Sequence, residues 1–166
     1  YGNAFISRFY LDYENKSLVE KTIKNLKKIW QNKDVLIIEG EFSRLGIGND
    51  LFDGVSSLQR LICPSKNAFS HYTEILEKAK ELGKDKLVLI ALGPTATVLS
   101  YDLACAGFWA VDIGHVDIEY SWYLEKADHK IPVKYRLVNE STNQKSIDLP
   151  ETLKEIYLKS IIYKIE

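Results

Sequence analysis

The stretch DKLVLIALGPTATVL, residues 85–99, decides the fold class of this chain. Residues 85–92 are a short continuous apolar run, which is typical of a strand buried on both faces of a parallel sheet. Gly93 and Pro94 close the run, and proline suits the first turn of a helix because its missing N–H would have no partner there. We therefore predict a strand over 85–92 that leads directly into a helix reaching about Ala106.

Apolar patterns elsewhere in the chain extend this alternation of strands and helices. Short continuous runs predict strands, and apolar residues at helical spacing predict helices. The alternation implies crossover connections and hence a parallel sheet. We expect one α/β domain over residues 1–166, with a Rossmann-like parallel sheet, helices on both faces and a C-terminal helix. The predicted helices are 17–30, 67–83 and 149–165, and the other predicted strands are 34–40, 58–63, 108–114 and, at an edge, 133–138.

Residues at the predicted helix ends match known capping patterns. Ser17 and Glu20 have the spacing of a capping box, and Asn67 is the expected N-cap of the second helix. Gly83 is expected to stop that helix, and Pro150 to stand in the first turn of the last one.

The composition is that of an ordinary globular protein and excludes several classes of function. Among 166 residues there are 22 Lys and Arg against 23 Asp and Glu, a net charge of −1, so no basic surplus indicates nucleic acid or an anionic membrane. The apolar runs are too short to span a bilayer, and we expect no secretory leader, because residues at the start of this sequence lack a charged-then-apolar pattern. We expect a cytoplasmic protein in which Cys63 and Cys105 are buried free thiols, with a disulfide as the alternative.

Three predicted strands end in segments that carry polar residues and glycines. These segments are 39–52, 92–103 and 107–124. In an open parallel sheet, ligands gather beyond the carboxyl ends of the strands. Because all three segments leave such ends, we predict that they open onto one site.

The first segment offers a loop for an anionic donor. Gly46 and Gly48 permit close backbone approach to an anion, and Arg44 would be its countercharge. The glycines come too late after the strand for a dinucleotide fingerprint, so nicotinamide binding is rejected. Asn49 and Asp50 complete the predicted donor-binding loop. The alternative is a structural loop with an Asn-Asp helix cap.

The second segment, Gly93-Pro94-Thr95-Ala96-Thr97, has the character of an anion site at a helix N-terminus. The N–H groups of Ala96 and Thr97 are expected to be free, with the hydroxyls of Thr95 and Thr97 beside them. We predict that these five residues bind the phosphate of a donor. An ordinary helix start that binds nothing is the alternative.

The third segment, HVDIE, suggests metal ligands. On an extended backbone the two-residue spacing puts Asp117 and Glu119 on the same side. Such a carboxylate pair suits Mg²⁺ or Mn²⁺, with His115 as a third ligand or a hydrogen-bonding neighbour. The alternative is a polar strand end, and Asp112 would be either part of the site or a buried structural acid.

Four stretches together resemble the bacterial glycosyltransferases of the GT-D fold, long filed as a domain of unknown function. They are GEFSRLGIGNDLF, CPSKNAFSHYTEI, LIALGPTATVLSYDL and AVDIGHVDIEY, and the resemblance covers about residues 35–125. It implies transfer of a hexose, typically glucose from UDP-glucose, to a glycan acceptor on a serine-rich-repeat glycoprotein or a surface polysaccharide. The family's acid-x-Glu metal motif matches Asp117 and Glu119, and its members usually carry a further N-terminal segment that we expect this chain to lack.

The resemblance and the residues together define the expected chemistry. Asp117 and Glu119 would hold Mn²⁺ or Mg²⁺ at the donor diphosphate, and Glu41 completes the predicted catalytic set. Glu41, Asp50 and His115 are three unranked candidates for the group that accepts the proton of the acceptor hydroxyl. Analogy with the family favours inversion at the anomeric carbon. A homo-oligomer is left open. The main alternative is a non-catalytic module that binds a nucleotide sugar or phosphate, and a methyltransferase fits the loop after residue 40 poorly.

Overall fold

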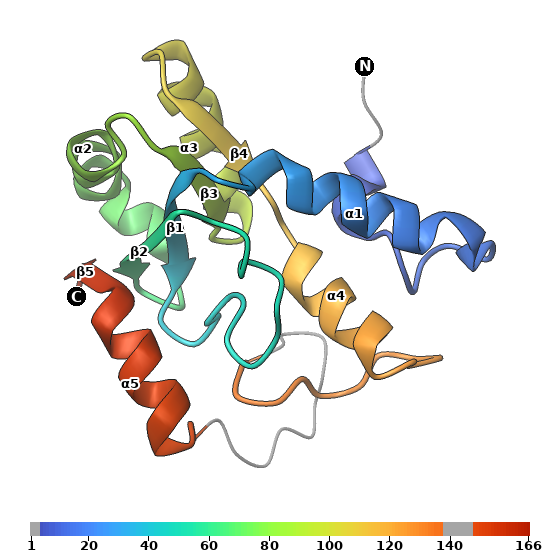
Figure 1. Cartoon of the computed structure of the whole chain (residues 1–166). Helices are drawn as coiled ribbons and strands as arrows, with labels where there is room; N and C mark the ends of the chain where they lie inside the picture. The colour runs from blue at the N-terminus through green and yellow to red at the C-terminus, as the bar shows by residue number, and fades with distance from the viewer. Residues whose placement is uncertain (1–3, 138–147) are drawn as a thin grey trace.

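Five parallel strands form the sheet in this computed structural model, which describes residues 4–137 and 148–166 (Figure 1). The strand order is β4-β3-β1-β2-β5, and each neighbouring pair is parallel. All the strands that the sequence predicts are present except the edge strand over 133–138. They are β1 (Asp34–Gly40), β2 (Ser57–Cys63), β3 (Leu87–Ala91) and β4 (Trp109–Asp112), joined by β5 (Ile161–Lys164).

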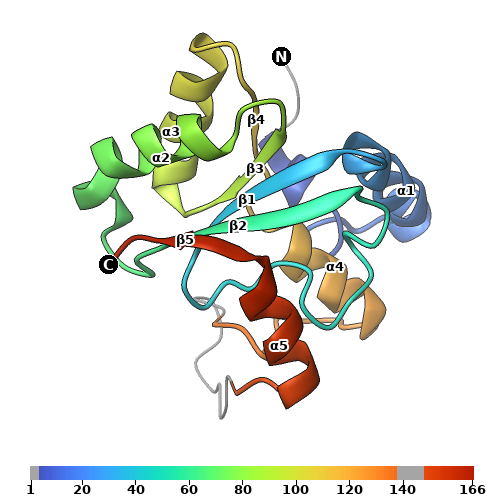
Figure 2. The same ribbon diagram turned by 60° about the vertical axis from the view of Figure 1, so that its left-hand side comes forward.

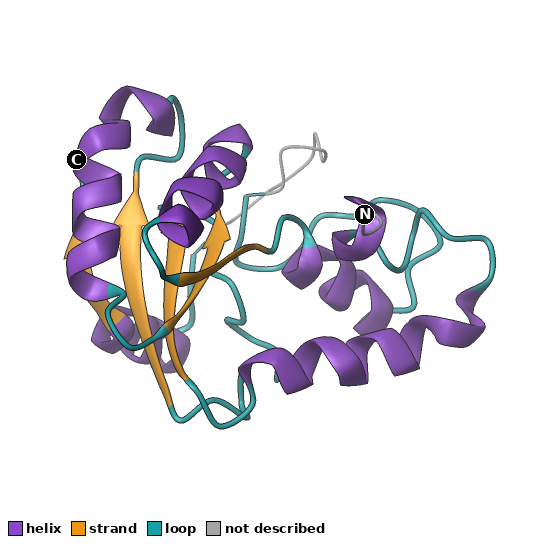
Figure 3. Ribbon diagram, turned by 90° about the horizontal axis from the view of Figure 1, so that it is seen from above, coloured by secondary structure: helices purple, strands orange, loops and turns teal. Residues whose placement is uncertain are grey.

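Alternate residues of the central strands supply two separate cores, so helices cover both faces as predicted (Figure 3). Ile37 and Leu89 pack toward α1 (Val19–Trp30) and α4 (Val116–Leu124). Their neighbours Ile38 and Ile90 pack toward α2 (Tyr72–Leu82) and α3 (Pro94–Cys105). All four strand residues have no exposed surface, which is why the runs read as continuously apolar.

The connection from β1 to β2, residues 41–56, has no helix although it joins two parallel strands. It loops out between α4 and α5 (Glu151–Ser160), an arrangement visible in both Figure 1 and Figure 2. Irregular connections of this length in compact domains are usually functional. We call residues 41–56 the β1–β2 loop.

The C-terminal region differs from the prediction. The expected helix over 149–165 ends at Ser160, and Ile161–Lys164 then pairs with β2 as a fifth strand. Two isoleucines and a tyrosine favour this edge strand over a continued helix. The predicted edge strand is wrong over 133–137, which is irregular, and residue 138 lies outside the described residues.

Three smaller expectations also need correction. Ser17 and Glu20 do not form a capping box; Asn15 instead accepts the N–H of Ser17 ahead of the 3-10 turn η2 (Lys16–Leu18). Asn67 has a left-handed backbone, makes no side-chain cap, and precedes the 3-10 turn η3 (Ala68–His71). Both cysteines are free, but Cys105 is exposed.

Two predicted helix ends are confirmed: Gly83 is the C-cap of α2, and Pro94 begins α3. Pro150 is the N-cap of α5 and so lies one position before its first turn. A short 3-10 turn, η1 (Ala4–Ser7), opens the described part of the chain. No helix in that part combines the length and the apolar character needed to cross a bilayer.

Candidate active site

Asp117 lies in the first turn of α4 and is buried, so the predicted extended backbone at this position is wrong. Its Oδ1 accepts hydrogen bonds from the N–H of Gly46 and the side-chain amide of Asn49, each at 3.0 Å. Its Oδ2 forms an ion pair with buried Arg136. Asp117 therefore ties the β1–β2 loop and residue 136 to α4.

Arg136 also holds these segments together. It was not predicted as a site residue, because it lies in a segment that resembles an edge strand in the sequence. Its guanidinium also donates to the hydroxyl of Ser121, at 3.0 Å, and to the carbonyl oxygen of Ile47. A buried ion pair is tolerated only when hydrogen bonds offset the loss of water from both charges. Here the bonds come from three segments, so the pair fixes how they pack.

Glu119 is fully buried and points to a different part of the molecule. Its Oε2 accepts the backbone N–H groups of Tyr10, at 2.8 Å, and Leu11, at 2.9 Å. Residues two apart on a helix are separated by about 200° around its axis, so the two carboxylates diverge. Glu119 thereby anchors the N-terminal segment to α4, and the predicted joint projection of the two acids is wrong.

These contacts do not fit a divalent ion shared by Asp117 and Glu119. Asp117 already carries a guanidinium and two further donors, and Glu119 binds backbone N–H groups elsewhere. His115 has its Nε2 3.3 Å from a guanidinium nitrogen of Arg8. Within residues 4–137 and 148–166, no group of three or more His, Cys, Asp or Glu side chains is arranged to hold a metal.

The loop after β3 leaves the sheet beside the β1–β2 loop, because β3 and β1 are neighbours. Gly93 turns the chain at φ +55°, a backbone conformation that favours glycine. The N–H of Ala96 donates to the carbonyl oxygen of Gly93 at 3.0 Å. The prediction that this N–H is free to bind an anion is therefore wrong. Thr95 is buried, and the exposed Thr97 donates to Asp112 at 2.9 Å.

The structure thus places the two predicted donor loops at the same edge of the sheet but gives them different neighbours. Gly46 and Asn49 bond to Asp117, whereas Thr97 bonds to the end of β4. Asp50 accepts from Lys27 at 2.7 Å and from the Tyr120 hydroxyl at 2.6 Å. The hydrogen bond from Lys27 is the main reason that the pKa of Asp50 is lowered.

Gly46 is required by its backbone and by its surroundings. Its φ is +75°, and an added Cβ would lie 2.5 Å from the Cδ2 atom of the Phe52 ring. We expect Gly46→Ala to lower the free energy of unfolding by about 1–3 kcal/mol, because it adds backbone strain and a clash. Urea unfolding measures the change; Gly107→Ala, which has φ +88° and nothing within 4 Å, is the control for strain alone. Equal stability of Gly46→Ala and the wild type would contradict this account.

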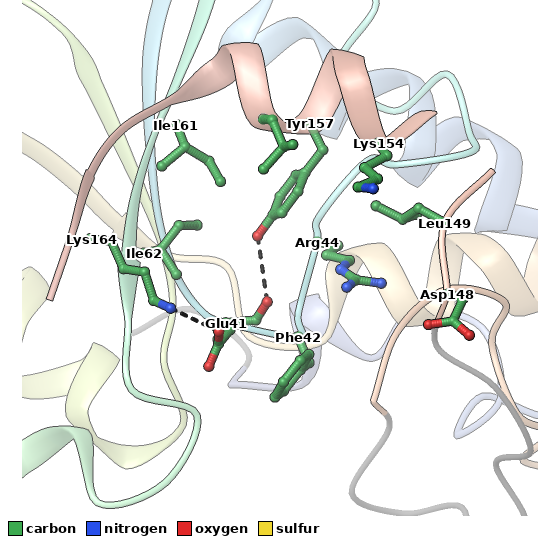
Figure 4. Close-up of a pocket in the computed structure, with 11 residues that line it drawn as sticks. Glu41, Phe42, Arg44, Ile62, Asp148, Leu149, Lys154, Tyr157, Ile161 and Lys164 are labelled. Atoms are coloured by element: carbon green, nitrogen blue, oxygen red, sulfur yellow. Dashed lines mark hydrogen bonds and ion pairs between the residues drawn. The ribbon is translucent and has the colours of Figure 1, made fainter. Parts of the chain in front are cut away.

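A cavity of about 460 Å³ lies beyond the carboxyl ends of β1 and β2 (Figure 4). The start of the β1–β2 loop forms one wall, and α5 with β5 forms the other. Its volume is that of a typical small-ligand site. Of the predicted site residues, it brings together Glu41 and Arg44. We call it the α5 cavity, and it is lined by Glu41, Phe42, Arg44, Ile62, Asp148, Leu149, Lys154, Tyr157, Leu158, Ile161 and Lys164.

Charged side chains face each other across the α5 cavity. Glu41 and Lys164 form an ion pair of 2.9 Å, which raises the pKa of Lys164. Arg44 donates to the carbonyl oxygen of Tyr135 at 2.9 Å, and its guanidinium lies over the rings of Phe42 and Tyr157, at 5.9 and 5.8 Å. Both Arg44 (φ 47°) and Tyr135 (φ 68°) have left-handed backbones. Such strain in large residues clusters at functional sites.

A second buried ion pair, Glu39–Arg60, lies behind this cavity and was also missed in the sequence. Glu39 accepts the N–H of Leu45 at 2.7 Å, and Arg60 donates to the carbonyl oxygen of the same residue at 2.7 Å. Arg60 further donates to the hydroxyl of Ser160 in α5, at 2.9 Å, and lies over the Tyr157 ring. Burial raises the pKa of Glu39, against the opposing charge of Arg60. The pair fixes both walls of the α5 cavity to the sheet.

Comparison with known proteins adds a family match to this geometry. Residues 1–141 match the model of the family described as glycosyltransferase GT-D fold. The chain is 47% identical over 148 residues to a probable glycosyl transferase, Gly, of Streptococcus gordonii, covering 89% of this chain and 22% of that protein. It is 41% identical over 165 residues to glycosyltransferase GlyD of Streptococcus pneumoniae serotype 4, covering 99% of this chain and 20% of that protein. The chain therefore spans about a fifth of the length of these curated relatives.

Two solved structures share the architecture over the whole chain. One, described as the highly conserved domain of unknown function 1792 with a distinct glycosyltransferase fold, has a TM-score of 0.92 at 42% identity and is covered over 59% of its length. The other, described as a new glycosyltransferase from Streptococcus sanguinis, has a TM-score of 0.88 at 40% identity and is covered over 61%. The fold of this chain thus belongs to an architecture known among glycosyltransferases.

Proposed function

This chain belongs to the glycosyltransferase family of the GT-D fold, and on that premise we propose that it transfers glucose from a UDP-sugar to a glycan acceptor. The acceptor would be carried by a serine-rich-repeat glycoprotein or a surface polysaccharide. The observation that supports this function best is the α5 cavity, which combines two carboxylates with three cations at the carboxyl ends of two parallel strands. Ligands of open α/β sheets bind at this edge.

The transfer needs a group that accepts a proton from the acceptor hydroxyl. As the acceptor oxygen bonds to the anomeric carbon, the bond from that carbon to the diphosphate breaks and UDP leaves. The three candidates for the base differ in their surroundings. Asp50 is held by Lys27 and Tyr120, and His115 lies against Arg8. Glu41 is paired with Lys164, but it alone of the three lines the α5 cavity. We propose that Glu41 takes the proton, in a single displacement that inverts the anomeric carbon.

Assistance by Mn²⁺ or Mg²⁺ stays a prediction from the family resemblance. A bound divalent ion would stabilise the charge of the departing diphosphate as a Lewis acid. Asp117 and Glu119 do not fit as its joint ligands, because both oxygens of Asp117 and Oε2 of Glu119 accept from donors of different segments, and only Oε1 of Glu119 has no hydrogen-bond partner among the described residues. The proposed role of Glu41 and of the cavity cations is independent of that ion.

Hydrolysis of a UDP-sugar, with or without an acceptor, tests the proposed function. We expect this chain to release UDP from UDP-glucose, faster with a glycan acceptor, and to bind UDP more tightly than ADP. The assay is run with added Mn²⁺ and after chelation, which also measures the metal dependence. Binding of UDP with no turnover under either condition would favour the non-catalytic module, and no preference for UDP over ADP would contradict the donor assignment.

A further inference from the structure

We infer that a cavity at the amino ends of β1, β3 and β4 binds a neutral sugar unit of a glycan, with the Trp109 ring as its stacking surface. The cavity has a volume of about 500 Å³, and its lining includes Trp109 and the charged residues Lys33, Asp34, Lys84, Asp85 and Lys86. We call it the Trp109 cavity. In Figure 1 the arrow of β1 points toward the side where α5 lies, away from these amino ends. The site therefore goes beyond the proposed function, which concerns the opposite edge of the sheet.

Trp109 is unlike the other two tryptophans of the chain. Trp30 and Trp122 are buried, whereas Trp109 is 52% exposed although it begins a strand of the sheet. In the sheet it lies beside Leu87 of β3, which in turn lies beside Val35 of β1. Because neighbouring strands are about 4.8 Å apart, the ring stands at one side of a cavity mouth that crosses three strand starts. An indole in this position offers a flat apolar face with a polar edge.

Two charged side chains next to this ring come from the start of β1. The Nζ atom of Lys33 lies 4.9 Å from the centroid of the Trp109 ring, a cation–π contact that leaves about half of the side chain exposed. Asp34 accepts a hydrogen bond from the hydroxyl of Ser57 at 2.5 Å. A donor and an acceptor thus accompany the stacking surface.

The turn that enters β3 supplies the other charges. Lys86 donates to the carbonyl oxygen of Leu82 at 2.6 Å. Within residues 4–137 and 148–166, the side chains of Lys84 and Asp85 make no hydrogen bond or ion pair, so both can bind a ligand. Three ammonium groups and two carboxylates line the cavity in all, so neither sign of charge dominates.

The helices around the Trp109 cavity direct their C-terminal ends toward it. Gly83 is the C-cap of α2 and Ala106 is the C-cap of α3, and both residues line the cavity. A helix C-terminus carries a partial negative charge and has carbonyl oxygens without a partner inside the helix. These ends and the two carboxylates disfavour a phosphate, while the three lysines disfavour a metal cation. The electrostatics therefore favour a neutral, polar ligand.

A sugar is the neutral ligand that uses both the ring and the polar groups. The C–H bonds on one face of a sugar ring are partly positive, so they are attracted to the negative face of an indole. Its hydroxyl groups donate to carboxylates and carbonyl oxygens and accept from ammonium groups. The chain belongs to a glycosyltransferase family, so a glycan is also a ligand that fits its chemistry. At this edge the cavity would hold a part of the glycan remote from the site of transfer.

Nuclear magnetic resonance of the indole N–H groups tests this site, because the chain has three tryptophans and two of them are buried. The probes are maltotriose, cellotriose and chitotriose, which are neutral trisaccharides. We expect at least one of them to move the Trp109 signal and to leave the signals of Trp30 and Trp122 in place. The Trp109→Phe variant identifies the Trp109 signal by its loss.

Variants measure how much the ring contributes to sugar affinity. Trp109→Ala should weaken binding of the same trisaccharide about tenfold, because it removes the stacking surface, while Trp109→Phe should weaken it less than threefold. Ligand-observed titration gives both affinities. The matched control is Phe69→Ala, which removes an aromatic ring that is 59% exposed and does not line the cavity, and it should bind as the wild type does.

Several results would overturn the site. They are an unmoved Trp109 signal with all three sugars, equal affinity of Trp109→Ala and the wild type, or an equal loss in Phe69→Ala. A larger shift of the Trp109 signal with inorganic phosphate than with the sugars would reject a neutral ligand. The titration contains no UDP-sugar, so failure of UDP-glucose turnover leaves the site standing. Turnover without a shift of the Trp109 signal would keep the proposed function and reject this site.

Discussion

Replacing Asp117 by asparagine is expected to lower the free energy of unfolding by about 3–5 kcal/mol, the usual cost of removing one partner of a buried ion pair. Asparagine has almost the same shape, but it leaves the guanidinium of Arg136 buried without a countercharge. It also weakens the acceptor of the Gly46 N–H and can mispair with the Asn49 amide. Urea unfolding followed by circular dichroism measures the change.

The control for this variant lies on the same helix. Glu125 is the C-cap residue of α4, and its pair with Lys134, at 3.8 Å, is largely exposed. Glu125→Gln should therefore leave the unfolding midpoint nearly unchanged. A stable Asp117→Asn protein that has lost all transfer would contradict the structural role and restore Asp117 as a ligand of the donor or its metal.

If the proposed transfer of glucose uses Glu41 as its base, replacing Glu41 by glutamine is expected to lower the transfer rate by about 10²- to 10⁴-fold, the range lost with a general base. Glutamine keeps the size of the side chain but cannot take the acceptor proton. The fold should be unaffected, because the ion pair of Glu41 with Lys164 is nearly half exposed on both sides. Initial rates at saturating UDP-glucose, together with thermal unfolding curves, measure the two effects separately.

Glu155→Gln is the matched control, since Glu155 is an exposed carboxylate on α5, and neither it nor its partner Lys159 lines the α5 cavity. It should transfer glucose at the wild-type rate. UDP affinity should also survive in Glu41→Gln, because the proposed base acts on the acceptor hydroxyl and not on the nucleotide. Full activity of Glu41→Gln would remove Glu41 from the mechanism and leave the cavity as a binding site only.

The sheet could be predicted because its central strands obey a simple physical rule. Ile37, Ile38, Leu89 and Ile90 are buried from both faces, so they stand in the continuous apolar runs 35–38 and 87–92, each with a glycine within two residues of its end. The edge of the sheet lacks that signal. The strand Ile161–Lys164 is short and follows α5 without a break, so its residues merge with the pattern of the helix.

The candidate site could be predicted only in part, because its charges are paired across long distances in the sequence. Asp117 and Glu119 were recognised as unusual acids, but their partners are Arg136 and the N–H groups of Tyr10 and Leu11. A two-residue spacing indicates a shared ligand only on a strand, and α4 begins one residue before Asp117. Glu41 and Arg44, which the sequence suggested as a catalytic and a donor-binding residue, both line the α5 cavity, and their roles stay predictions; α5 brings in the opposite wall by folding back.

A crystal structure of this chain with UDP tests the central claim most directly, because the two candidate anion sites lie on different parts of the same sheet edge. We predict electron density for UDP in the α5 cavity, with Glu41 on the side where the sugar would lie. Density for the diphosphate at residues 93–97, with the α5 cavity holding only water, would contradict the account.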